Sequence, residues 1–478
     1  MNNWSKKKKI GMGFLALFIV LCIVAAIVTP IEFCTRLGET SSWMWSKDQD
    51  FSMLYTDWKK EIEEGKRTVN GETSLNMNSV APYAVATLRK DPNKDFVILN
   101  FTDTQVDLPS NFSKTGKIYK TMKKVIEQSK PDLITFSGDQ AWFPPTRQSY
   151  AELARVMDGF KIPWTFAFGN HDHQGNSDLN YLVEVAQKSK YCLIDKGPRN
   201  VTGVGNCFIN IVEKQDNGKD KIVHTVILLD TGDSGYDYTE EQTYYDADPI
   251  TEDDITVINQ NIQGTAMKEA LGDCTMDFNK YPFLKEIIEE NKENPDDVRN
   301  KHIGSVKVGK SYSTFDISQI EWYKWVLQGN QKVNEKNGFE NAMPESTCVF
   351  HIAFNEFYDA YKQWLTAIKN NDVEGVKAMQ AEGRMRMDEA IGSGTYNPKM
   401  FSAMIELGST KNVIIGHDHV NDFSLVYQGI RLTYGVKTGS KCYWEEDGSM
   451  NGGTKLTIGN GGTATSLKQV YIDDYMKK

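Results

Sequence analysis

Five short polar motifs in this chain carry side chains of the kinds that bind metal ions. In chain order the motifs read TDTQ, SGDQ, GNHD, FHIA and GHDH, and each follows an apolar run. Their candidate ligands are Asp103, Asp139, Asn170, His351, His417 and His419. Carboxylate and amide oxygens and imidazole nitrogens are donors that divalent metal ions accept. Two such ions side by side can activate water for attack on a phosphate ester, so the motifs predict a two-metal hydrolytic site.

The residues within these motifs suggest distinct roles. A carboxylate such as Asp103, directly after the apolar run FVILNF, must be paired or metal-bound to be stable there. Asp139 has two oxygens to share and is the natural bridging ligand. His171 stands next to Asn170 and is not a candidate ligand, so it is the candidate general acid that protonates the leaving oxygen. Asp172 is predicted either to orient His171 or to tie down the loop, and we favour the second.

The elements that must position these motifs alternate between apolar runs and amphipathic stretches. The runs FVILNF, DLITFSG and PWTFAFG predict strands, with helices between them near 114–129 and 148–159. This order is typical of an α/β layered fold, in which ligands gather beyond the carboxyl ends of the strands. Further strands are predicted at NCFINIVE, HTVILLD, NVIIG, FSLVYQ, IRLTYG and LKQVYI, and further helices at 317–328 and 356–387.

A stretch at about 236–312 interrupts this alternation. It is acidic and irregular, and it is long for a loop of a compact domain. We predict an insertion over or beside the site, and a solvated acidic loop without a role in substrate selection is the alternative. The chain as a whole divides into an N-terminal segment at 1–30, a polar stalk or docking segment at 31–90, and a catalytic domain at 91–478. This insertion lies within the catalytic domain.

The N-terminal segment has the pattern of a membrane anchor. Lys6 to Lys9 precede an uninterrupted apolar stretch from Ile10 to Val28. At about 1.5 Å per residue, a helix of this length nearly covers a hydrocarbon core of about 30 Å. The lysines favour the cytoplasmic side, which predicts an extracytoplasmic catalytic domain. A signal peptide, removed to give a secreted protein, is the alternative.

The composition is that of an ordinary globular chain, with 40% hydrophobic and 25% charged residues. A net charge of -10 argues against broad nucleic-acid binding, which requires a basic face. No nucleic-acid partner is expected. The cysteines show no CxxC spacing, and Cys192 and Cys207 are either a disulfide across a turn or two free buried thiols.

The five motifs resemble those of the calcineurin-like metallophosphoesterase family, which read D-x-H, G-D, G-N-H-D/E, H and G-H-x-H. The sequence segments PWTFAFGNHD and IIGHDHVNDF are most similar to those of the branch that includes yeast Dcr2 and the plant class-29 purple-acid-type phosphatases. The resemblance implies a four-layer α/β/β/α sandwich around two divalent ions. It also implies that Asp103, Asp139 and His419 hold one ion. The other would be held by Asp139, Asn170, His351 and His417.

Two positions depart from the family pattern. Gln105 stands where the family has a metal-binding histidine, so one ion would meet an amide oxygen instead of an imidazole. Trp142 stands where purple acid phosphatases have a tyrosine ligand, which argues against an iron(III)-tyrosinate centre. The ions are expected to be Mn, Fe(II) or Zn, because mixed nitrogen and oxygen ligands do not discriminate sharply among them.

Three functions fit the sequence. The first is a phosphomonoesterase that uses a metal-bridging hydroxide as nucleophile. The second is a phosphodiesterase for cyclic nucleotides or lipid headgroups on the same metal centre. The third is a metal-stabilised binding protein without activity, and the presence of His171 argues against it, because a structural site has no use for a general acid. We favour the phosphomonoesterase.

Overall fold

A computed structural model describes residues 19–20, 54–57, 84–106, 112–142, 145–198, 201–236, 251–276, 278, 311–389, 391–394, 397–439 and 451–472. The apolar segment predicted to anchor the chain in a membrane lies outside these residues, except for Ile19 and Val20. Among the residues that are described, no helix is both long enough and apolar enough to cross a bilayer.

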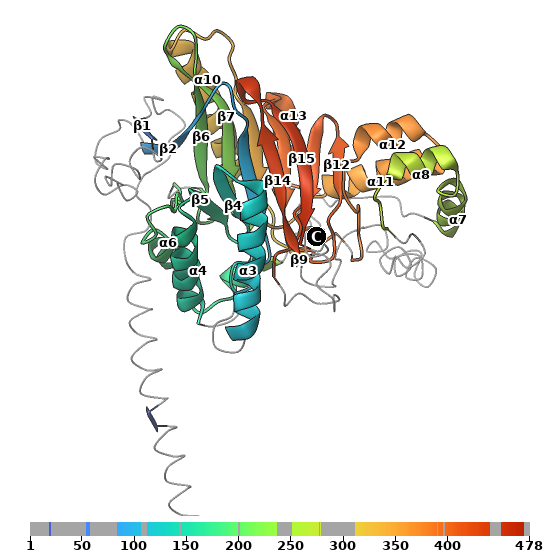
Figure 1. The fold of residues 1–478 in the computed structure, drawn as a ribbon, viewed down its shortest axis with the longest axis horizontal. Coiled ribbons are helices and arrows are strands. Elements are labelled where there is room, and N and C mark those ends of the chain that lie inside the picture. The colour runs from blue at the N-terminus through green and yellow to red at the C-terminus, as the bar shows by residue number, and fades with distance from the viewer. Residues whose placement is uncertain are drawn as a thin grey trace, which may run out of the picture.

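Two β-sheets carry the fold (Figure 1). The eight-stranded sheet has the order β1 (Leu54–Asp57), β2 (Ala84–Lys90), β6 (Cys207–Lys214), β7 (Asp220–Leu228), β10 (Glu345–Val349), β11 (Thr410–Ile415), β13 (Ile430–Tyr434) and β12 (Ser424–Tyr427). The five-stranded sheet has the order β15 (Ala464–Tyr471), β14 (Gly452–Ile458), β3 (Phe96–Phe101), β4 (Leu133–Ser137) and β5 (Trp164–Ala167). Strands β8 (Ser234–Tyr236) and β9 (Ser311–Tyr312) form a separate ribbon.

Helices pack around the two sheets and on one another. They are α3 (Phe112–Ser129), α4 (Thr146–Phe160), α5 (Asn170–His173), α6 (Leu179–Ala186), α7 (Glu252–Asn261), α8 (Thr265–Leu271), α10 (Ile317–Lys336), α11 (Glu356–Lys369), α12 (Val373–Met379) and α13 (Met400–Leu407). Helices α3, α4 and α6 share a core with the smaller sheet, while α10, α11 and α13 pack on the larger one. A short 3-10 helix, η2 (Asn460–Gly462), precedes β15.

Alternation along the strands builds the two hydrophobic cores. Ile227 of β7 faces the core shared with α10 and α11, whereas its neighbours Val226 and Leu228 face the core between the sheets. Successive strand side chains point to opposite faces, so a strand buried on both sides is apolar throughout. The two sheets therefore lie face to face between helical layers, and the predicted α/β fold is confirmed.

Three local features differ from the predictions. Strand β2 lies within the range predicted as a stalk, where it pairs in parallel with β6 of the larger sheet. The helix predicted over 356–387 is two helices that end at Met379, because Asn371 has a positive φ of 55° and Asp372 caps α12. The stretch predicted to be irregular contains α7 and α8, which pack beside α11 and α12 (Figure 1). Outside these two helices, the structure describes only residues 236, 251, 262–264, 272–276, 278 and 311–312 of this stretch.

Candidate metal centre

The candidate ligands meet where parallel strands of the two sheets end. Asp103, Asp139 and Asn170 follow β3, β4 and β5, which are parallel neighbours in the smaller sheet. His351 and the pair His417 and His419 follow β10 and β11, which are parallel neighbours in the larger sheet. Strands β4 and β10 contact each other across the sandwich. Carboxyl ends of parallel strands share one edge, so the topology gathers all five motifs.

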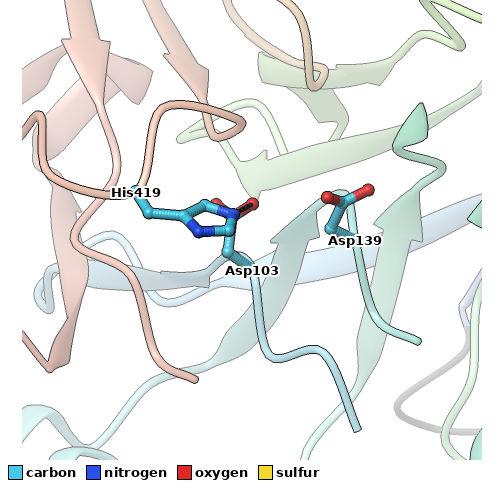
Figure 2. Close-up of side chains that lie close together, drawn as sticks. All are labelled: Asp103, Asp139 and His419. Atoms are coloured by element: carbon cyan, nitrogen blue, oxygen red, sulfur yellow. Dashed lines mark ion pairs between the residues drawn. The ribbon is translucent and has the colours of Figure 1, made fainter. Parts of the chain in front are cut away.

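One cluster consists of two carboxylates and an imidazole. Ligand atoms of Asp103, Asp139 and His419 all lie within 4.8 Å of one another, and all three side chains are buried (Figure 2). His419 Nε2 lies 3.3 Å from Asp103 Oδ1. The backbone amide of His417 donates to both Asp103 oxygens, at 3.3 and 3.2 Å, and fixes the carboxylate.

A second cluster adjoins the first through Asp139. His351 Nε2 lies 3.3 Å from Asp139 Oδ1 and 3.1 Å from Asn170 Oδ1. His417 Nδ1 lies 2.9 Å from the same Asn170 oxygen. The Nδ1–H group of His351 donates to the carbonyl oxygen of Ser137 at 2.8 Å, which leaves its Nε2 as the basic nitrogen. Such an outer hydrogen bond orients a metal-binding imidazole.

Backbone strain is concentrated at this edge. Asp103, Gln105, Asp139 and His417 all have positive φ values, at 49°, 44°, 54° and 80°. Residues other than glycine avoid this region, and each such residue costs on the order of 1–3 kcal/mol. Gly138 adopts φ 105°, and a Cβ on it would lie 2.5 Å from His351 Cγ. The turn is therefore built to bring backbone and ligands close together.

The charges at the centre depend on one another. Burial alone would raise the pKa of Asp139, but His351 and the other imidazoles outweigh it and hold the pKa below its usual value. Burial and His351 lower the pKa of His417 to about 3. Burial would also lower the pKa of His351, but Asp139 raises it to about 9. Two ionised carboxylates thus lie in a buried pocket and need positive charge nearby.

The donor set fits divalent metal ions. Asp139 Oδ2 is buried and has no hydrogen-bond partner among the described residues, which is unfavourable for a carboxylate unless a cation completes its surroundings. This oxygen belongs to Asp139, the residue that both clusters share. The first cluster can offer Asp103, Asp139 and His419 to one ion. The second can offer Asp139, Asn170, His351 and His417 to another, so the structure brings these six predicted ligands together.

Comparisons with known proteins agree with this arrangement. A family model described as calcineurin-like phosphoesterase matches residues 96–330. Residues 96–330 belong to the calcineurin-like phosphoesterase family. A relative named probable inactive purple acid phosphatase 29, from Arabidopsis thaliana, is 22% identical over 383 residues, covering 75% of this chain and 76% of that protein. Phosphatase DCR2 of Saccharomyces cerevisiae is 30% identical over 139 residues, covering 26% of this chain and 24% of that protein.

Among solved structures, a dimetal phosphatase from Danio rerio aligns with 79% of this chain and 98% of its own, at 12% identity and a TM-score of 0.38. The matched family model is one of phosphoesterases, and the donor set of the two clusters suits divalent metal ions.

The predicted general acid, His171, lies beside the Asp139 carboxylate, which both clusters share. The backbone amide of His171 donates to Asp139 Oδ1 at 2.9 Å, and its Nε2 lies 3.9 Å from Asp139 Oδ2. The side chain is 25% exposed, so a substrate can reach it. The ring centroids of Trp142 and His171 are 5.8 Å apart. His171 therefore lies at the edge of the centre rather than within either cluster.

Asp172 performs the structural role that the sequence analysis favoured. Its carboxylate accepts the backbone amides of Gly169 at 3.0 Å, Ala141 at 3.0 Å and Gln140 at 3.3 Å. Burial and the nearby Asp139 raise its pKa to about 7. The carboxylate thus ties the turn after β4 to the turn after β5. It therefore positions the turns that carry Asp139 and Asn170.

Gln105 lies at the edge of the first cluster. Its Nε2 is 3.1 Å from His419 Nε2, so a half-turn of the amide would bring its oxygen to the same place. The position therefore suits a weak oxygen ligand to the ion held by Asp103 and His419.

Two residues near the centre were not predicted. The Tyr312 ring packs edge-on against His417 with centroids 4.4 Å apart, and burial raises the Tyr312 pKa to about 12. Gln174, a polar residue in the loop after α5, contacts His171. No local pattern marks Tyr312, because it follows a long stretch of weak periodicity.

Arg384 and Arg386 lie in an irregular segment after α12. Arg386 pairs with Asp388, and the Arg384 guanidinium stacks 3.9 Å from the Tyr471 ring centroid. Cys192 and Cys207 are free buried thiols rather than a disulfide.

Proposed function

We propose that this chain hydrolyses phosphate monoesters at a pair of divalent metal ions. The observation that carries the proposal is the Asp139 carboxylate. It adjoins both ligand clusters, has one buried oxygen without a hydrogen-bond partner among the described residues, and lies beside His171. A metal site with only a structural role has no need for an exposed acid at that place.

The residues of the chain divide the chemistry among them. Two divalent ions bound here would supply positive charge for the phosphoryl oxygens and lower the pKa of a water. Asp103, Asp139 and His419 would hold one of them, with Gln105 as a weak further ligand. Asn170, His351 and His417 would hold the other together with Asp139. Mn, Fe(II) and Zn all suit such mixed donors.

The proton for the leaving oxygen would come from His171. As the bond between phosphorus and the leaving oxygen breaks, Nε2–H of the protonated imidazole donates to that oxygen and the ring becomes neutral. Asp172 would keep His171 in place indirectly, because it fixes the turn that carries it. The position of His171 Nε2, 3.9 Å from Asp139 Oδ2, supports this division of roles.

A binding role without catalysis is the second candidate. The Arabidopsis relative carries the word inactive in its name, and Gln105 replaces a ligand of the family pattern. A centre with one weakened ion could bind phosphate esters without hydrolysing them. Diester cleavage on the same centre is a further outcome that the assay below distinguishes.

We further infer that the segment from Ile10 to Val28 holds the chain in a membrane with the catalytic domain outside the cytoplasm. Its unbroken apolar character and the lysines before it support this location. Secretion after cleavage is the alternative, and the mass of the mature chain distinguishes the two.

Hydrolysis of p-nitrophenyl phosphate beside bis-p-nitrophenyl phosphate tests the proposed function. The full chain in detergent would be loaded with Mn, Zn or Fe(II), with His171→Ala and Asp139→Asn as variants. Faster monoester turnover that Asp139→Asn abolishes and His171→Ala lowers supports the proposal. Preferred diester turnover would replace it with a phosphodiesterase, and binding without turnover would favour the second candidate.

A further inference from the structure

A chain of side-chain hydrogen bonds leads away from the predicted general acid. Gln174 Oε1 lies 2.9 Å from His171 Nδ1, and Gln174 Nε2 donates to Asp233 Oδ1 at 2.8 Å. Gln174 directly follows α5, in the loop after β5 of the smaller sheet, and Asp233 lies in the loop between β7 of the larger sheet and β8. Both bonds are exposed, and none of the three residues is a candidate metal ligand.

The chemistry of these groups fixes which atom carries each hydrogen. An ionised carboxylate only accepts, so Asp233 requires the NH₂ group of Gln174 to face it. The amide oxygen of Gln174 then faces His171, and an amide oxygen cannot donate. His171 Nδ1 must therefore carry a hydrogen. The basic nitrogen of the neutral ring is Nε2, which faces Asp139 at 3.9 Å.

We propose that Gln174, oriented by Asp233, is a positioning residue that fixes the tautomer and direction of His171. The inference rests on the proposed function, because it concerns the acid of that reaction. The protonated ring donates from Nε2–H to the ester oxygen as the phosphorus–oxygen bond breaks, and the Nδ1–H bond to Gln174 persists before and after. The same nitrogen therefore faces the leaving group in both protonation states.

A second contact between the same two loops argues that Gln174 is not required merely to join them. His173 Nε2 lies 2.8 Å from Asp230 Oδ1, and Asp230 is buried at 3% exposure. This pair already connects the turn after β5 to the turn after β7. The bond from Gln174 to Asp233 is exposed and adds little to that connection. Its remaining consequence is the orientation of His171.

The inference also predicts the class of ester that benefits. Esters of weakly acidic alcohols and phenols need a proton on the leaving oxygen, whereas strongly acidic phenols depart without one. An acid held in one tautomer therefore favours alkyl phosphates and phosphates of ordinary phenols. Substrates with activated leaving groups would gain little from it.

The experiment compares two esters that differ in leaving-group acidity. Phenyl phosphate and 2,4-dinitrophenyl phosphate would be hydrolysed by the metal-loaded full chain and by Gln174→Met, which keeps the length of the side chain without its hydrogen bonds. Turnover of phenyl phosphate should fall by about tenfold to hundredfold, while the dinitrophenyl ester should change by less than about threefold. His171→Ala should show the same selectivity, and combining it with Gln174→Met should add no further loss.

His173→Gln provides the matched control, because it loosens the same two loops without touching His171. It should affect both esters alike. A nitrogen NMR measurement on histidine-labelled protein, with His171 assigned by its absence in His171→Ala, gives a readout independent of turnover. The wild-type ring should be the Nδ1–H tautomer when neutral, and Gln174→Met should lose that preference.

The inference is overturned if Gln174→Met slows both esters equally, slows neither, or leaves the tautomer unchanged. A selective loss in His171→Ala without one in Gln174→Met would reject the inference and keep the proposed function. Failure of the wild-type chain to hydrolyse either ester with any metal would instead reject the proposed function itself.

Discussion

Replacing Gly138 by alanine should damage the metal centre in two ways. It strains the backbone at residue 138, and its new Cβ collides with the side chain of His351. Gly138 has φ 105°, where a residue with a Cβ is strained by on the order of 1–3 kcal/mol. The new Cβ would lie 2.5 Å from His351 Cγ and closer still to Nδ1. Because His351 is fully buried, its ring has little room to move without losing the hydrogen bond to Ser137.

The expected loss of stability follows from these terms. The strain together with about 1 kcal/mol for the hydrogen bond lowers the free energy of unfolding by about 2–4 kcal/mol. Gly159→Ala is the matched control, because Gly159 lies in α4 and a Cβ there meets nothing within 4 Å. That substitution should raise stability by about 0.5–1 kcal/mol, since alanine is the better helix former.

Urea unfolding in EDTA measures the stability of both variants, and calorimetric titration measures their metal affinity. Gly138→Ala should unfold at lower urea and bind at least one ion about tenfold more weakly, since His351 is displaced. Gly159→Ala should bind metal as the wild type does. A Gly138→Ala variant with wild-type stability and affinity would refute the assigned geometry around His351.

Two further predictions concern a ligand and a buried histidine. Gln105→His restores the imidazole of the family pattern and should bind the ion beside Asp103 about tenfold more tightly in calorimetric titration; unchanged affinity would show that residue 105 is not a ligand. Burial lowers the pKa of His224 from 6.5 to about 4, so the neutral folded form should lose about 3 kcal/mol of stability as the pH falls from 6.5 to 4, because the unfolded chain binds the proton first. His224→Gln should flatten the dependence of urea midpoint on pH in that window, and equal slopes in both proteins would contradict the assignment.

The sequence predicted the ligands because their positions obey a local rule. Each motif follows an apolar strand, and parallel strands in a layered fold present their carboxyl ends together. Asp139 and Asn170 could therefore be assigned to one centre without knowledge of the contacts. The division into clusters was available only through the family resemblance, since spacing along the chain does not reveal which imidazole faces which carboxylate.

Strand β2 was missed because its polar residues depend on distant partners. Lys90 is buried and pairs with Glu213 at 2.9 Å, and Arg89 binds Asp220 at 2.6 Å. A run that ends in two cations has the pattern of an exposed segment. The side-chain partners Glu213 of β6 and Asp220 of β7 account for the two cations in a sheet. Both partners lie more than a hundred positions away along the chain.

The role of Gln174 shows a similar limit. A glutamine in a polar loop after GNHD is ordinarily a solvated side chain, and nothing nearby in sequence marks it. Its orientation depends on Asp233, which arrives from the end of β7. The role of Asp172 was easier to predict from the sequence. A buried acid one residue after a candidate general acid has few roles other than accepting hydrogen bonds from backbone amides.

Counting metal ions per chain tests the central claim most directly. The full wild-type chain, equilibrated with Mn or Zn and freed of unbound ions, should contain about two ions by elemental analysis. Asp139→Asn, which weakens the carboxylate next to both clusters, should contain fewer than about one. Fewer than about one ion in the wild type, or two ions retained in Asp139→Asn, would contradict a two-metal centre bridged by Asp139.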